Sequence, residues 1–191
     1  MSALDTFKAK APGLMDLLMR DFGISDLSAA AIVGNLGHES NGFSSLQEIN
    51  PTVRGSRGGY GYAQWTGPRR REFEAYCERN NLNPAGQKAN YGFLFIELNT
   101  SEKRAIAAVT KAYGLDAKVE AFEKSFLRAG IKHYPSRKEW ALRALVAYQK
   151  AGKAPPVPTP PDVPEPATGG ILGLLAMLLK FLLSILPKRS K

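Results

Sequence analysis

Residues 29–40 read Ala29-Ala30-Ala31-Ile32-Val33-Gly34-Asn35-Leu36-Gly37-His38-Glu39-Ser40. Apolar residues recur here three or four positions apart, which predicts a helix with one apolar side. That side consists of Ala29, Ile32, Val33 and Leu36. Glu39 lies three residues after Leu36, so its carboxylate continues the apolar side of the helix, and Gly42 can end the helix just beyond it.

Burial of a carboxylate favours its neutral form, which a general acid near neutral pH needs. The sequence therefore predicts that Glu39 is a proton donor at the end of a buried helix. The alternative is a surface glutamate, or one that is paired with an arginine such as Arg54 or Arg57.

A glycine-rich aromatic stretch follows about twenty residues later, Gly58-Gly59-Tyr60-Gly61-Tyr62-Ala63-Gln64-Trp65. Its glycines permit close approach of a ligand to the backbone, and its aromatic rings suit the flat faces of sugars. The amide of Gln64 suits hydroxyl or acetamido groups. We therefore expect Tyr60, Tyr62, Gln64 and Trp65 to bind substrate, although core packing is the alternative for at least one of the aromatic residues.

Further charged residues extend the predicted site. Glycosidic cleavage often uses a second carboxylate, and Glu48 is the best candidate, with an ordinary loop acid as the alternative. Glu97 lies among core residues, which favours a structural role. The run Arg69–Arg71 opposes the dipole at a helix start, which predicts contact with anions such as peptidoglycan carboxylates, Arg70 included, or a solvated basic face. Two isolated histidines and one cysteine predict no zinc site, and no cofactor is expected.

Composition sets broader limits. The chain has 191 residues with Lys+Arg 26 against Asp+Glu 17, a net charge of +9, which suits an anionic nucleic acid, membrane surface or cell wall. Cys77 is the one cysteine, so an internal disulfide is excluded. The first residues lack the pattern of a conventional secretory signal.

Three regions differ in composition. Residues 1–152 predict a mainly α-helical domain in which residues 44–65 are irregular or form a small β-hairpin. Within it, Pro12-Gly13 should begin one helix, and Ser136 with Glu139 should form the capping box of the last. Residues 153–168 are rich in proline and predict a stiff linker. Residues 169–191 are apolar with a basic end, which favours a membrane-active or transmembrane segment over a helix docked on the domain.

The motifs together resemble those of a known family. Gly34–Ser40, Leu46–Glu48, Gly58–Arg70 and Phe93–Leu98 are similar to segments of the phage tail lysozyme family, within the lysozyme-like superfamily of goose-type lysozymes and lytic transglycosylases. The resemblance covers about residues 13–150. It implies a helical lysozyme fold and cleavage of the β-1,4 bond between N-acetylmuramic acid and N-acetylglucosamine, with Glu39 as general acid. It also implies that Gln64 and the tyrosines line the glycan cleft.

We therefore expect a phage-type endolysin that acts on peptidoglycan as a monomer, binds no nucleic acid and contacts the bacterial membrane through residues 169–191. The expected location is the periplasm or inner membrane of the host cell. The alternatives are a lytic transglycosylase that forms 1,6-anhydromuramic ends, and a virion-associated tail lysin. A wall-binding or membrane-disrupting protein without enzyme activity, and a tail component with a vestigial lysozyme domain, also remain open.

Overall fold

Seven α-helices and one π-helical turn make up the part of the computed structural model that is described, residues 1–51 and 55–152. In chain order they are α1 (Ala3–Phe22), α2 (Asp26–Glu39), α3 (Gly67–Arg79), α4 (Gln87–Asn99), α5 (Arg104–Lys111), α6 (Gly114–Phe122), η1 (Glu123–Leu127) and α7 (Tyr134–Lys150). These residues form no sheet. The mainly α-helical prediction is confirmed, and the expected hairpin is reduced to two isolated antiparallel bridges that join Tyr60 to Gln47 and to Trp65.

Two predicted regions lie outside the described residues, the proline-rich linker (153–168) and the apolar segment (169–191). In the described part of the chain, no helix combines the length and the apolar character that crossing a membrane requires.

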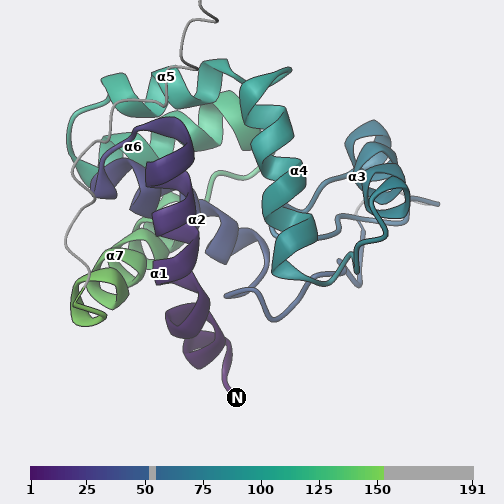
Figure 1. Ribbon diagram of the computed structural model, residues 1–191, viewed down its shortest axis with the longest axis horizontal. Coiled ribbons are helices and arrows are strands. Elements are labelled where there is room, and N and C mark those ends of the chain that lie inside the picture. The colour runs from purple at the N-terminus through teal and green to yellow at the C-terminus, as the bar shows by residue number, and fades with distance from the viewer. Residues whose placement is uncertain (52–54, 153–191) are drawn as a thin grey trace, which may run out of the picture. The chain divides into compact units, whose positions relative to one another are not determined.

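Helix α2 lies in the middle of the domain. Every residue from 28 to 37 is buried, so burial extends beyond the predicted apolar side to the whole circumference of this mostly apolar helix. A helix that is apolar all round needs neighbours on all sides, and α2 packs against α1, α6 and α7 (Figure 1). A turn at Ser25, whose hydroxyl accepts a hydrogen bond from the Ser28 N–H, begins the helix.

Two glycines let α2 approach its neighbours closely. A Cβ atom added at Gly34 would lie 2.4 Å from the Cα and N atoms of Ala141 in α7. A Cβ atom at Gly37 would lie 2.4 Å from the ring of Phe7 in α1. Only a residue without a side chain fits at either point, so the two glycines fix how near α1 and α7 come to the central helix.

Two predicted helix starts were wrong. Helix α1 begins at Ala3, where Ser2 and Asp5 form a capping box, and Pro12 lies inside the helix. Proline removes one backbone hydrogen bond there, but the buried residues on both sides of it continue without a break, so packing outweighs the loss. Helix α7 begins at Tyr134, and Ser136 lies within its first turn without capping it.

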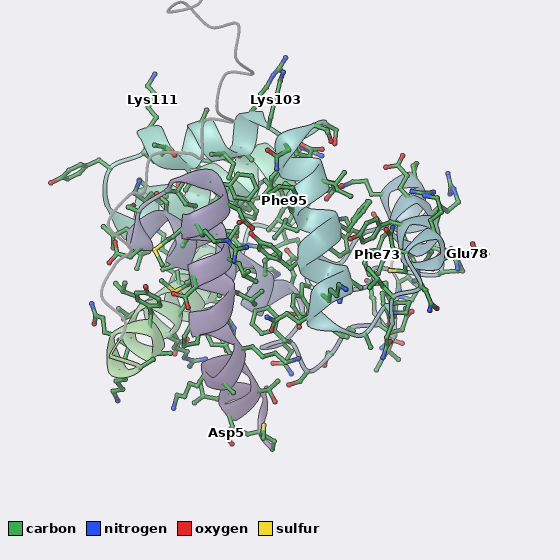
Figure 2. The ribbon with its side chains drawn as sticks, viewed as in Figure 1. Asp5, Phe73, Glu78, Phe95, Lys103 and Lys111 are labelled. Carbon is green, nitrogen blue, oxygen red and sulfur yellow. The ribbon has the colours of Figure 1, made fainter. Side chains whose placement is uncertain are left out.

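Helices α3 and α4 form the other side of the domain, together with the irregular segment that precedes them (Figure 1). Phe73 of α3 is fully buried against Trp65, with ring centroids 4.8 Å apart, and against Phe93 of α4 at 5.5 Å. Figure 2 shows Phe73 on the side of α3 that faces α4, and Glu78 on the outer side. This aromatic cluster anchors the glycine-rich segment, residues 58–65, to the helices.

Candidate active site

Glu39 is the last residue of α2, and the chain turns sharply directly after it. Asn41, Gly42 and Phe43 all have positive φ angles, of 46°, 66° and 67°. The N–H of Gly42 donates to the carbonyl of Gly37 at 2.7 Å, so the predicted end of the helix near Gly42 is confirmed. A Cβ atom at Gly42 would lie 2.5 Å from the backbone oxygen of Ala3, which leaves no room for another residue.

The carboxylate of Glu39 is paired with an arginine. Its Oε1 atom accepts a hydrogen bond from Nη2 of Arg137 at 2.7 Å, and the side chains are 18% and 2% exposed, respectively. The alternative of an arginine-paired glutamate is therefore right in kind, but the partner comes from α7. Of the arginines considered from the sequence, Arg57 pairs with Glu74 at 2.6 Å, and Arg54 lies outside the described residues.

Arg137 donates hydrogen bonds to two further residues besides Glu39. Its Nε donates to the carbonyl of Lys132 at 2.6 Å, and its Nη1 donates to Oδ1 of Asn35 at 3.2 Å. The amide of the fully buried Asn35 in turn donates to the carbonyl of Val119 at 3.1 Å. Sequence reasoning missed both Asn35 and Arg137. The available signal was a polar residue inside an otherwise apolar helix, one turn before Glu39.

His38 also faces α7. Its Nδ1 lies 2.9 Å from the hydroxyl of Ser136, and its ring centroid lies 5.4 Å from that of His133. Burial is the largest cause that lowers the pKa of His38, the charges of Arg137 and His133 act in the same direction, and together they bring it to about 4. His38 is therefore neutral near pH 7 and carries no proton to donate as an imidazolium.

Two of the predicted sugar-binding aromatic residues are core residues. Trp65 is 1% exposed, and its Nε1–H donates to Oε2 of Glu97 at 2.7 Å. Tyr62 is 2% exposed, its hydroxyl lies 3.3 Å from Nζ of Lys10, and burial raises its pKa to about 12. Neither ring offers a face to a ligand, so the core-packing alternative describes both, and Tyr60 is the aromatic residue of this segment that stays half-buried.

Glu48 and Gln64 bind the loop to itself. Oε2 of Glu48 accepts from the N–H of Gly59 at 2.7 Å, which leaves its second oxygen for other partners. Nε2 of Gln64 donates to the carbonyls of Leu46 and Gly61 at 3.0 and 2.9 Å. Among the described residues, no hydrogen bond or ion pair joins Glu39 to Glu48 or to Gln64.

The glycines of this loop serve its own packing. A Cβ atom at Gly59 would lie 2.8 Å from Oε1 of Gln64, and one at Gly61 would lie 2.6 Å from Oδ1 of Asn90. The same Asn90 oxygen accepts the backbone N–H of Tyr62 at 2.8 Å. The close approach that the sequence suggested for a ligand is thus occupied by the protein.

Two residues of the arginine run, Arg69 and Arg70, bind other parts of the protein, whereas Arg71 is exposed. Arg70 is 8% exposed and donates to the carbonyls of Arg57 and Gly58 and to Oε1 of Gln47, all within 2.9 Å. Its Nε also pairs with Glu74 at 3.0 Å. Arg70 therefore holds Gln47, Arg57 and Gly58 against α3, and these hydrogen bonds offset the cost of a positive charge at the helix start.

Glu97 supports the fold, as its position among core residues predicted. It is 4% exposed, and its two oxygens accept from Nε and Nη2 of Arg69 at 2.7 and 2.9 Å and from Trp65. One buried carboxylate thus connects α4, the start of α3 and the glycine-rich segment.

Two of the cavities in the described part of the domain lie between helices. One of about 430 Å³ lies between α3 and α4 and includes Arg71 and Tyr76. Another of about 870 Å³ lies between α1 and α7 and includes Pro12 and Leu142. Glu39 lines neither of them. In residues 1–51 and 55–152, no group of three His, Cys, Asp or Glu side chains is arranged to hold a metal ion.

No curated protein sequence matches the chain. A family model described as Phage tail lysozyme matches residues 9–148. The match runs from within α1 to within α7, so it includes the five α-helices between them, and it contains both Glu39 and Arg137. It agrees with the resemblance seen in the sequence motifs, and it ends before the proline-rich region. The chain therefore belongs to the phage tail lysozyme family.

Proposed function

We propose that this protein is a phage-type lysozyme that cleaves the β-1,4 bond between N-acetylmuramic acid and N-acetylglucosamine in bacterial peptidoglycan, with Glu39 as the general acid. Membership of the family suggests a peptidoglycan-cleaving glycosidase. The observation that supports Glu39 most directly is its position at the end of the buried helix α2, with 18% of its side chain exposed and one oxygen in contact with Arg137.

In the proposed reaction, Glu39 gives its proton to the glycosidic oxygen, and the bond from that oxygen to C1 of N-acetylmuramic acid breaks. The positive charge that develops on the sugar ring is relieved when water attacks C1, and Glu39 takes up the proton that the water loses. Glu48 positions this water with the oxygen that Gly59 does not hold. Atoms and charges balance, and Glu39 returns to its starting state.

The peptidoglycan product separates hydrolysis from transglycosylation. If water attacks, the new N-acetylmuramic acid ends are reducing. If the 6-hydroxyl of the same sugar attacks, they are 1,6-anhydro ends, and mass spectrometry of digested sacculi distinguishes the two. We propose hydrolysis, so reducing ends are the expected result.

The test of Glu39 is a turbidity assay on purified sacculi. Glu39→Gln keeps an oxygen that can accept from Arg137 but has no proton to give, so we expect a loss of at least ~10²-fold in rate with the thermal unfolding temperature retained. Glu78→Gln is the matched control, because Glu78 is exposed on the outer side of α3 (Figure 2). A folded Glu39→Gln protein that clears sacculi at the wild-type rate would refute the proposal.

A further inference from the structure

Arg137 is a buried cation with one carboxylate partner among the described residues. The side chain is 2% exposed. Burial of a guanidinium costs free energy unless an anion pairs with its charge and hydrogen-bond acceptors bind its N–H groups. In the described part of the chain, Glu39 is the one carboxylate that meets this charge. The other two partners, the Lys132 carbonyl and the Asn35 amide oxygen, are neutral and fix the plane of the guanidinium.

The loop that presents the Lys132 carbonyl is itself anchored. Glu123 is fully buried at the start of the π-helical turn η1, and it accepts from the Ala129 N–H at 2.8 Å. It also accepts from Nζ of Lys132 and from the hydroxyl of Tyr134, both at 3.0 Å. Both ends of the loop between η1 and α7 are thus tied to one carboxylate, and π-helical turns are frequent at functional sites.

The two carboxylate oxygens of Glu39 have different surroundings. Oε1 faces a positively charged N–H donor at 2.7 Å, which opposes a proton on that atom. Oε2 accepts no hydrogen bond from the described residues, and the side chain keeps 18% of its surface exposed. The proton that a general acid delivers must therefore be carried by Oε2.

We propose that Arg137 is a positioning residue for Glu39: it occupies Oε1, directs the acidic proton to Oε2, and stabilises the carboxylate that remains once the proton has moved to the substrate. This inference rests on the proposed function of Glu39. It assigns to α7, about a hundred residues away in sequence, the control of the orientation of the acid on α2.

The experiment compares the full-length proteins Arg137→Met, Arg137→Lys and Arg143→Met on soluble peptidoglycan glycan strands. Arg143 is the matched control, because it also lies on α7 and pairs with a glutamate, Glu139, which is exposed. Each protein is assayed well below its own unfolding temperature, and kcat and KM are measured.

For Arg137→Met we expect a fall in kcat of ~10- to 100-fold with KM within about threefold of the wild type, because the acid is misplaced but the glycan still binds. Arg137→Lys keeps the charge but not the planar group, so its kcat should lie between those of the wild type and Arg137→Met at unchanged KM. Arg143→Met should match the wild type.

A folded Arg137→Met protein with the wild-type kcat would overturn the inference. If that variant does not fold, Arg137→Lys decides: a lower kcat at unchanged KM supports the positioning role, and a wild-type kcat overturns it. Activity of Glu39→Gln would instead show that the proposed function has failed, so the two failures are distinguishable.

Discussion

Replacing Gly34 with alanine should destabilise the domain, because α2 touches the backbone of α7 at this residue. The added Cβ atom would lie 2.4 Å from Cα and N of Ala141, and 2.6 Å from its Cβ, whereas ordinary contacts begin at 3.4 Å. The closest contacts must therefore lengthen from 2.4 to 3.4 Å, an increase of 1.0 Å. The closest atoms of Ala141 belong to its backbone, which cannot move aside as the end of a flexible side chain can. The two helices must therefore separate.

The cost follows from two opposing effects. Overpacking a close-packed core costs about 1–3 kcal/mol, and a clash with backbone belongs at the upper end. Alanine in place of glycine inside a helix stabilises the folded state by about 1 kcal/mol. The net loss of about 2 kcal/mol should lower the midpoint of thermal unfolding by roughly 4–8 °C for a domain of this size.

The same displacement should reach the site. Gly34 lies five residues before Glu39 on α2, and Ala141 lies four residues after Arg137 on α7. Separation of the helices at Gly34 therefore lengthens the 2.7 Å contact between the carboxylate and the guanidinium. We expect the rate on purified sacculi to fall as well, at a temperature where the variant is fully folded.

Gly13→Ala is the matched control. Gly13 also lies inside a helix, α1, but an added Cβ atom there meets nothing within 4 Å. This substitution should stabilise the domain by about 0.5–1 kcal/mol with no change in rate. Thermal unfolding followed by circular dichroism measures both variants. If Gly34→Ala melts at or above the wild-type temperature, the argument that close packing of α2 on α7 stabilises the fold is wrong.

Two further predictions concern buried groups. Trp65→Phe removes the N–H that Glu97 accepts and should cost roughly 1–2 kcal/mol of unfolding free energy, while KM for soluble glycan strands stays the same because the ring is buried. A raised KM at unchanged stability would show that Trp65 contacts substrate after all. His38 has a pKa of about 4 in the folded state against 6.5 ordinarily, so the unfolded chain binds more protons between these values and the free energy of unfolding should fall as pH drops from 6.5 towards 4. After allowance for solvent screening of the half-buried ring, the loss should be roughly 1–2 kcal/mol; it should be absent in His38→Gln, and urea unfolding at both ends of this range measures it.

Local patterns in the sequence predicted the mainly helical fold, but not every helix start. Apolar spacing and glycine positions predicted that α2 is a buried helix that ends at Glu39, and the motif resemblance predicted the family. The failures at Pro12 and Ser136 have a common cause, since strong local signals for helix ends were overridden by burial of the residues around them.

The composition of the glycine-rich segment was a poorer guide. Aromatic and amide side chains suit both a sugar and a protein core, and nothing within the segment distinguishes the two uses. Trp65 is buried and the half-buried Gln64 binds the protein itself, because α4 and residues 45–46 supply the groups that they bind.

The sequence alone determined that an acidic residue stands at the end of an apolar helix in a phage tail lysozyme family domain, because periodicity and motifs are properties of neighbouring residues. Only the tertiary structure determined that Arg137 meets that acid and that most of the glycine-rich segment serves the fold. Such pairings depend on which faces of distant helices come together. Here the close contact between Gly34 and Ala141 brings α7 onto α2 and so sets the surroundings of Glu39.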